Sequence, residues 1–210
     1  MTRSYVVGLD LGQAADFTAL AVVEAVTGDE KGGSPGEGTY QVRHLERFPL
    51  KTTYPAIVER VQQLTSTLQK EDPHVRLIVD HTGVGAAVVD LLVKADLSPI
   101  AITITGGDQV THEGRLWRVP KRDLVAVLAV AFQSGRLKIA RDLPESATLV
   151  NELLNFKVKI NLATAHDSYE AWRSGQHDDL VLAVALAVWA ARKMVPTENR
   201  FPLVGIRRRW

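Results

Sequence analysis

The sequence predicts an α/β domain with a mixed central sheet, which starts with three antiparallel strands, continues with parallel strands and carries helices on both faces. Residues 5–12 and 16–25 are apolar runs joined by a turn so short that the two strands must be antiparallel. Residues 75–105 alternate strand, helix and strand, which is typical of parallel pairing through right-handed crossovers. Residues 180–191 are apolar almost throughout, as in a helix that is buried on every side.

Size and composition predict one globular domain over residues 1–210, because a chain of this length with 46% hydrophobic residues can bury a full core. The absence of cysteine excludes disulfides, thiolate zinc sites and cysteine nucleophiles, and it fits a reducing cytoplasm. No signal peptide or membrane span is recognisable, so we expect a cytoplasmic protein without a membrane partner. The formal net charge is only +1, so any nucleic-acid site must be a local cluster of Lys and Arg.

The first predicted strand contains an acid where an apolar residue is expected. With the strand period of two, Asp10 shares a face with Val6 and Gly8. A carboxylate among apolar neighbours is costly, so it must be protonated, accept hydrogen bonds or hold a cation. After the second strand, residues 28–38 contain no apolar residue and predict a flexible loop, and residues 39–48 supply the third strand.

The middle of the chain places a second acid at a strand end. A helix over residues 55–70 precedes a buried strand over 75–80, which ends on Asp80. A further helix over residues 84–95 and a strand over 99–105 complete the alternation. Open α/β sheets usually place their sites at the carboxyl ends of the strands, where Asp80 lies.

The second half of the chain predicts shorter elements. They are a polar loop over residues 106–119, a helix over 121–135, a strand over 137–139, a helix over 145–154, a strand over 156–160 and its hairpin partner over 161–172. The strand over 156–160 alternates apolar and basic residues, which predicts one core face and one positive face.

Asp178 and Asp179 stand at the head of the apolar helix. Taken alone they fit helix caps, because an acid suits the positive end of a helix dipole. If the strands of Asp10 and Asp80 are neighbours and the last helix packs across them, all of these acids converge at one edge of the sheet. Hard oxygen ligands of this kind favour magnesium or manganese over zinc.

Four segments in order resemble the nuclease domain of the large terminase subunit of tailed phages. They are residues 8–19 (GLDLGQAADFTA), 79–85 (VDHTGVG), 120–124 (PKRDL) and 177–183 (HDDLVLA). Each motif is common by itself, but the set of four in this order spans nearly the whole chain. The resemblance implies an RNase H-like fold, related to RuvC-like nucleases, with a two-metal site that cuts concatemeric double-stranded DNA during genome packaging.

The resemblance also implies roles for single residues. Asp10, Asp80 and Asp179 match the catalytic acids of that family, with Asp178 as an additional metal ligand. Two Mg²⁺ or Mn²⁺ ions would activate the attacking water and stabilise the leaving oxygen, which predicts hydrolysis that leaves 5′-phosphate ends. His177 could orient water or phosphate or be a hydrogen-bonded surface residue. We expect Asp16 to brace the turn after the first strand.

Contact with DNA is expected from basic residues in three segments. They are Lys157 and Lys159 on the predicted strand face, Lys121 and Arg122 at a helix start, and Arg115 and Arg118 beside Trp117 in the polar loop. Alternating lysines also fit an ordinary solvated strand face, and Trp117 also fits an anchor that ties the loop to the core.

The chain departs from full-length large terminases in one respect. Those proteins resemble P-loop motors in their N-terminal half, whereas no Gly-x-x-x-x-Gly-Lys-Ser/Thr pattern occurs here. We therefore expect no ATPase domain, in a chain that is either an excised nuclease domain or a protein made without its motor. By resemblance its partners would be DNA, a terminase ATPase domain, the small terminase subunit and the portal.

Three other functions remain open. The same acids would serve a RuvC-like Holliday-junction resolvase, which prefers four-way junctions. Residues 10–12 and 80–85 also look like the phosphate loops of a sugar-kinase or actin-like ATPase, although those proteins need two such domains. The third is a DNA-binding or assembly module with an inactive core, which the intact acids argue against.

Overall fold

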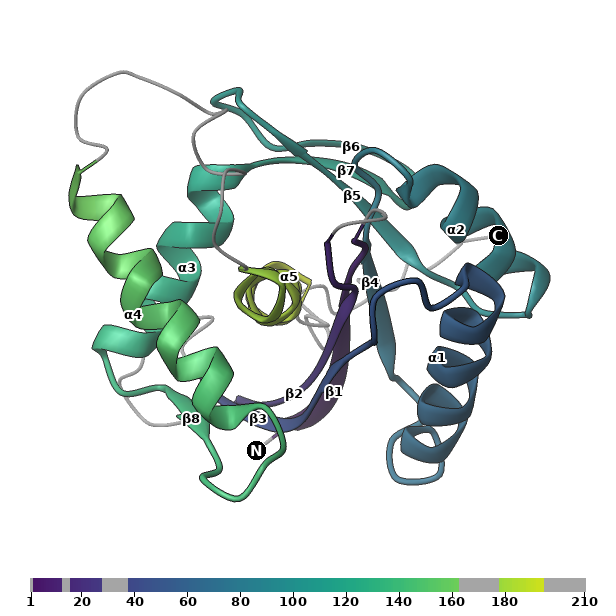
Figure 1. Cartoon of the computed structure of the whole chain (residues 1–210), viewed down its shortest axis with the longest axis horizontal. Helices are drawn as coiled ribbons and strands as arrows, with labels where there is room; N and C mark the ends of the chain where they lie inside the picture. The colour runs from purple at the N-terminus through teal and green to yellow at the C-terminus, as the bar shows by residue number, and fades with distance from the viewer. Residues whose placement is uncertain (1, 13–15, 28–37, 163–177, 195–210) are drawn as a thin grey trace, which may run out of the picture.

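The computed structural model describes residues 2–12, 16–27, 38–162 and 178–194, which form an eight-stranded sheet and five helices (Figure 1). The strands are β1 (Thr2–Asp10), β2 (Ala19–Thr27), β3 (Gly38–Arg47), β4 (Arg76–Asp80), β5 (Ile100–Thr105), β6 (Thr111–Glu113), β7 (Leu116–Pro120) and β8 (Leu137–Ile139). The helices are α1 (Tyr54–Leu68), α2 (Gly85–Lys94), α3 (Lys121–Gln133), α4 (Ser146–Leu162) and α5 (Asp179–Lys193).

The sheet is mixed, with strand order β6-β7-β5-β4-β1-β2-β3-β8. The strands β1, β2 and β3 are antiparallel neighbours. The strands β1, β4, β5 and β7 are parallel, and β8 is parallel to β3. This arrangement confirms the predicted antiparallel start and parallel continuation.

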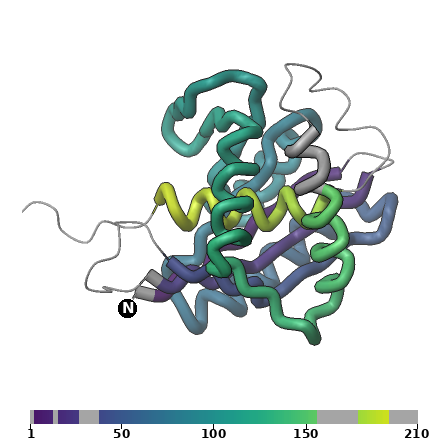
Figure 2. Tube along the Cα trace, turned by 90° about the vertical axis from the view of Figure 1, so that its left-hand side faces the viewer, coloured from purple at the N-terminus to yellow at the C-terminus, as the bar shows by residue number. Residues whose placement is uncertain are grey.

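Helices cover both faces of the sheet, as predicted. The helices α1 and α2 pack on one face over Val7, Leu9 and Val79. On the other face the sheet curves around α5, with α3 and α4 outside it (Figure 1). Seen from the side, α5 crosses α3 (Figure 2). Because strand residues alternate between faces, Val6, Gly8 and Asp10 all point toward α5.

The helix α5 is buried on all sides, which confirms the prediction from its apolar sequence. Its Trp189 is fully buried, and the helix lies directly on β1. A Cβ atom added at Gly8 would stand 2.0 Å from the Ala183 carbonyl oxygen. Only a residue without a side chain allows the helix and the strand to come this close.

Two predicted elements are wrong. Residues 156–160 are not a strand, because α4 continues through them to Leu162. A run of five alternating residues does not distinguish a strand from a helix, and no Gly or Pro interrupts the chain between Ser146 and Leu162. Residues 106–119 are not wholly a loop, because β6 and β7 form a hairpin there at the sheet edge. Edge strands are short and polar, so their apolar pattern is weak.

Parts of the predicted chain lie outside the described residues. These include residues 28–37 of the predicted flexible loop and residues 163–172 of the predicted hairpin partner, whose first two residues belong to α4. Among the helices that are described, none combines the length and apolarity that crossing a bilayer requires.

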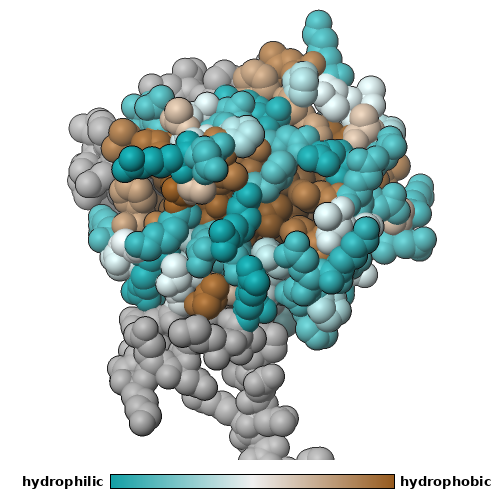
Figure 3. Space-filling view, turned by 90° about the horizontal axis from the view of Figure 1, so that it is seen from below, coloured by the Kyte–Doolittle hydropathy of each residue, from teal (hydrophilic) through white to brown (hydrophobic). Residues whose placement is uncertain are grey.

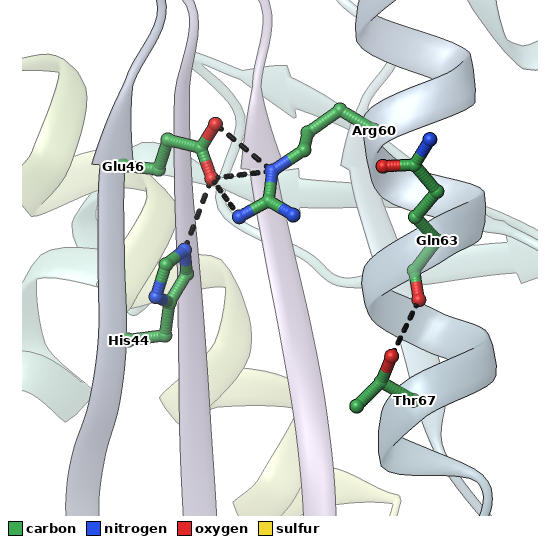
Figure 4. A network of polar contacts seen from close by, with 5 residues as sticks. All are labelled: His44, Glu46, Arg60, Gln63 and Thr67. Carbon is green, nitrogen blue, oxygen red and sulfur yellow. Dashed lines mark hydrogen bonds and ion pairs between the residues drawn. The ribbon is translucent and has the colours of Figure 1, made fainter.

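A polar network ties α1 to the sheet (Figure 4). The Arg60 guanidinium of α1 donates to both Glu46 carboxylate oxygens of β3, at 3.1 and 2.9 Å from Nε. The His44 ring lies 3.0 Å from the same carboxylate. Partial burial would raise the pKa of Glu46, but these partners outweigh it and lower the pKa. The network therefore favours an ionised Glu46.

The exposed apolar side chains are spread over several elements. The larger ones are Leu50 before α1, Val93 on α2, Val130 and Phe132 on α3, and Val150 and Leu154 on α4. On the face seen from below, apolar residues gather between hydrophilic ones (Figure 3). Single apolar side chains of this kind are ordinary on a protein surface.

Low pH should destabilise the pairing of the antiparallel strands β1, β2 and β3, because it protonates the Glu24 carboxylate. This β2 carboxylate is 3% exposed and pairs with Arg3 of β1 and Arg43 of β3. Burial raises its pKa, but the two arginines outweigh burial and lower it below the usual 4.5. A carboxylate whose pKa is lower in the folded than in the unfolded state stabilises the fold at pH values above its unfolded-state pKa. This contribution is lost as the pH falls through the folded-state pKa. We expect Glu24→Gln to destabilise the protein at neutral pH and the difference from the unchanged protein to shrink below about pH 4.5.

Thermal unfolding followed by circular dichroism between neutral and acid pH measures this difference. The matched control is Glu59→Gln on the exposed side of α1, which should follow the unchanged protein. An equal stability difference for Glu24→Gln at neutral and acid pH would contradict the assignment.

Candidate active site

Asp10 and Asp80 are side by side at the carboxyl ends of two neighbouring parallel strands. The pairing of β1 with β4 sets Leu9 opposite Val79, so the next residue of each strand is one of the two acids. Neighbouring strands are about 4.8 Å apart, and paired residues point to the same face. The two strands are therefore neighbours, which is the condition under which we expected the acids to converge.

The row that contains these acids continues across the sheet. Asp10 is opposite Ala19 of β2, and Ala19 is opposite Arg47 of β3. On the other side, Asp80 is opposite Ile102 of β5. The side chains of this row point toward α5, and the small Ala19 leaves room there for the start of that helix.

A tight turn supports Asp80. Its Oδ1 accepts a hydrogen bond of 2.8 Å from the Thr82 backbone N–H. A Cβ atom at Gly85 would lie 2.3 Å from the Asp80 carbonyl oxygen, so the start of α2 folds closely against the strand end. The Gly-rich sequence after Asp80 thus holds its backbone in place.

The start of α5 brings Asp178 and Asp179 to the same place. Both carboxylates act electrostatically on Asp10, together with Asp80. Asp10, Asp80 and Asp179 are only 7%, 8% and 6% exposed. Asp178 occupies the N-cap position of α5, but its side chain makes no capping hydrogen bond. The four acids that the sequence singled out therefore converge, and capping does not account for the pair on α5.

Burial and like charge act together on Asp10. Burial raises the pKa of Asp10 well above its ordinary value of 3.8, and the charges of Asp80, Asp179 and Asp178 raise it further. A hydrogen bond between the Asp10 and Asp80 side chains adds to the increase. Burial, the neighbouring acids and this hydrogen bond therefore all favour the protonated form of Asp10.

The donor set fits a divalent cation. All four groups are hard oxygen donors of the kind that Mg²⁺ and Mn²⁺ prefer, and a cation bound among them would offset their mutual repulsion. Across the described ranges, no group of three or more His, Asp or Glu side chains already has a metal-ligating arrangement.

Arg47 and Glu152 form a buried ion pair beside Asp179 that sequence reasoning missed. Arg47 Nη2 of β3 donates to Glu152 Oε1 of α4, and the same nitrogen lies 3.6 Å from Asp179 Oδ2. The guanidinium carbon is 4.9 Å from the centre of the Phe17 ring. A signal for Glu152 existed, because it lies on the helical stripe of Leu149 and Leu153, where an apolar residue is expected.

Glu152 also supplies the cap that Asp178 does not. Its Oε2 accepts a hydrogen bond of 3.1 Å from the Val181 backbone N–H in the first turn of α5. Burial raises the pKa of Glu152 to about 7, although Arg47 and the Val181 N–H both act to lower it. This carboxylate therefore joins α4, β3 and the start of α5 next to the acidic site.

The structure separates the basic residues that we predicted to contact DNA. Lys121 and Arg122 follow β7 at the carboxyl edge of the parallel strands, the edge of Asp80. Arg122 forms an ion pair of 2.5 Å with Asp108. Arg115 precedes β7 at the opposite edge and donates to the Ser98 carbonyl oxygen. Arg118 is exposed and, by strand alternation, points to the face opposite Asp80.

The remaining predicted residues are placed less fully. Lys157 and Lys159 belong to α4, so the predicted positive strand face is wrong, and the positions of their side chains are not described. His177 lies outside the described residues. Asp16 is exposed, and its carbonyl oxygen would lie 2.3 Å from a Cβ atom at Gly12, as expected for a residue that closes the turn.

Trp117 is an anchor for the edge hairpin. Its ring stacks on His112 of β6 at a centroid distance of 4.2 Å. On the other side it meets Trp189 of α5 edge-on at 5.5 Å. The second of the two sequence-based interpretations of Trp117, attachment to the core, is therefore confirmed.

Comparison with known proteins gives the same fold. The family described as the terminase RNase H-like domain matches residues 7–190. The large terminase nuclease of the thermophilic phage G20c is 20% identical, with a TM-score of 0.53 over 88% of this chain and 81% of that one. Its structure with bound zinc is 22% identical, with a TM-score of 0.53 over 88% and 80% of the chains.

A herpesvirus protein is similar to the same extent. The human cytomegalovirus terminase nuclease domain, soaked with Mn, is 17% identical, with a TM-score of 0.53 over 90% of this chain and 84% of that one. At these identities the structural likenesses show the fold alone. No curated protein sequence matches significantly. Because the family match covers most of the sequence, the chain belongs to the terminase RNase H-like domain family.

Proposed function

We propose that this nuclease domain is a metal-dependent endonuclease that hydrolyses phosphodiester bonds of double-stranded DNA. The observation that carries the proposal is the convergence of Asp10, Asp80 and Asp179, three buried acids from β1, β4 and α5, at one sheet edge. Buried acids that repel one another destabilise a fold, so a bound cation explains their proximity better than a structural role does.

Asp10, Asp80 and Asp179 would hold the metal ions, with Asp178 as an additional ligand. Two divalent ions there would lower the pKa of the attacking water and stabilise the charge of the leaving oxygen. The zinc-bound and Mn-soaked structures of the similar terminase nucleases support the binding of divalent metal. The strand β1 holds Asp10 in the row across the sheet, between Asp80 of β4 and Ala19 of β2.

Supercoiled plasmid is the substrate that tests the activity. We expect nicking and linearisation in Mn²⁺ or Mg²⁺, none in EDTA, and loss of cutting in Asp80→Asn and Asp179→Asn. Metal-dependent cutting that persists in both variants would overturn the assignment of these acids. A parallel reaction on a four-way junction distinguishes the alternative resolvase, which would cut the junction in preference to linear duplex.

Lys121 and Arg122 are the basic residues best placed to contact DNA near these acids. We expect the double variant Lys121→Ala/Arg122→Ala to bind duplex DNA more weakly. The slope of log K, the association constant for DNA, against log[salt] should become less steep by roughly two, about 0.9 for each lost phosphate contact. Fluorescence anisotropy at several salt concentrations measures both quantities.

The matched control is Lys70→Ala/Lys94→Ala, which removes two exposed charges from the C-terminal ends of α1 and α2, at the opposite edge of the sheet. An equal change of salt dependence in both double variants would argue against a local DNA contact. The terminase ATPase domain, small subunit and portal remain predictions from the resemblance.

A further inference from the structure

Arg47 is a cation held in place beside the acidic site. Its side chain is 14% exposed, and its main partner, Glu152, is 6% exposed. The guanidinium is held by the Glu152 carboxylate and by the Phe17 ring. Arginine stays protonated at all physiological pH values, so this positive charge is permanent.

Arg47 lies close to one acid of the site. Arg47 Nη2 is 3.6 Å from Asp179 Oδ2, and along the row Ala19 of β2 stands between Arg47 and Asp10. The guanidinium reduces the repulsion that the neighbouring carboxylates exert on Asp179. One side of the site therefore carries a fixed positive charge.

This fixed charge affects metal binding. The guanidinium is tied to Glu152 and stays beside Asp179 when a cation arrives. A cation at Asp179 must then bind close to a fixed positive charge, which opposes it.

We propose that Arg47, held by Glu152, is a positioning residue that orients Asp179 and weakens the binding of the divalent ion at that carboxylate. Asp10 and Asp80 then bind the first ion, and Asp179 completes the shell of a second, weaker one. This inference rests on the proposed metal site. According to this proposal, the charge of Arg47 lowers the metal affinity of Asp179, whereas Glu152 raises that affinity by neutralising Arg47. The two residues therefore have opposite effects, although they belong to the same ion pair.

Calorimetric titration of the protein with Mn²⁺ in the absence of DNA, at about pH 8, tests the proposal. Arg47→Met removes the charge and keeps an apolar side chain of similar length, so we expect the weaker Mn²⁺ step to tighten about tenfold. Glu152→Gln keeps Arg47 but removes the carboxylate that neutralises it, so we expect the same step to weaken. A merely structural ion pair would shift both variants in the same direction.

Arg43→Met is the matched control, because Arg43 lies on the same strand and pairs with the buried Glu24, away from Asp179. It should leave both Mn²⁺ steps unchanged. Unfolding temperatures measured beside each titration verify that the variants are folded, and Glu152→Gln alone gives the sign of the effect if Arg47→Met does not fold.

Unchanged Mn²⁺ affinity in folded variants, or shifts of equal sign, would overturn the inference and leave the proposed function intact. Absence of any Mn²⁺ binding by the unchanged protein would overturn the proposed function, and the inference with it.

Discussion

Asp10→Asn should abolish cleavage and at the same time stabilise the metal-free protein. Asp10 is central in the acidic row, and its burial and its three acidic neighbours raise its pKa. Asparagine has the same shape but neither ligates a cation as strongly nor carries a charge. We expect the cleavage rate in Mn²⁺ to fall roughly 1000-fold or more. Without metal, we expect the free energy of unfolding to rise by about 1–2 kcal/mol, because the variant no longer buries a repelled carboxylate.

Plasmid cleavage and thermal unfolding, each with and without Mn²⁺, measure the two effects. The unchanged protein should gain about 2.7 kcal/mol at a Mn²⁺ concentration of 100 Kd, and Asp10→Asn should gain far less. The control Asp90→Asn removes an exposed acid from α2 and should alter neither quantity. A variant that is less stable than the unchanged protein and is still stabilised by Mn²⁺ would contradict the role of Asp10.

Gly8→Ala should cause a large loss of stability. The added Cβ would lie 2.0 Å from the Ala183 carbonyl oxygen and 3.2 Å from the Ala187 backbone nitrogen. Both are backbone atoms of α5, so no side chain can rotate away and the helix itself must move. We expect a loss of about 3 kcal/mol or more in the free energy of unfolding.

The same change should impair catalysis in whatever fraction remains folded. Gly8 is two residues before Asp10, and Ala183 is one turn after Asp179, so a displaced helix moves one acid relative to the other. A displacement of about 1 Å costs roughly 100-fold in rate when reacting groups must be aligned.

Urea denaturation and cleavage below the unfolding transition measure the two losses. Gly107→Ala is the matched control, because the nearest atom to its added Cβ is 3.8 Å away. Full stability of Gly8→Ala would show that the contact between α5 and β1 is looser than described.

Local patterns predicted the strands and helices that carry the acids. The first hairpin, the strand that ends on Asp80 and the apolar α5 were all recognisable, because each is long or strongly apolar. To predict that Asp10, Asp80 and Asp179 converge, one further assumption was needed, namely that β1 and β4 are neighbours. The resemblance to terminase nucleases supported this assumption.

Other features depend on contacts that no local pattern records. Arg47 and Glu152 are 105 residues apart, and each is an ordinary surface residue type. The end of α4 was mistaken for a strand because its alternation is brief, and the β6–β7 hairpin was missed because an edge strand needs little apolar sequence. Such pairings are decided by tertiary packing rather than by neighbours in the chain.

The contact between β1 and α5 also governs when the site can form during synthesis. It joins the first strand to the last described helix, so the core on the α5 face of the sheet remains open until residues 179–193 have left the ribosome. A chain released earlier lacks both the helix that covers Gly8 and the carboxylate of Asp179. If the proposed function holds, we expect such incomplete translation products not to cut DNA.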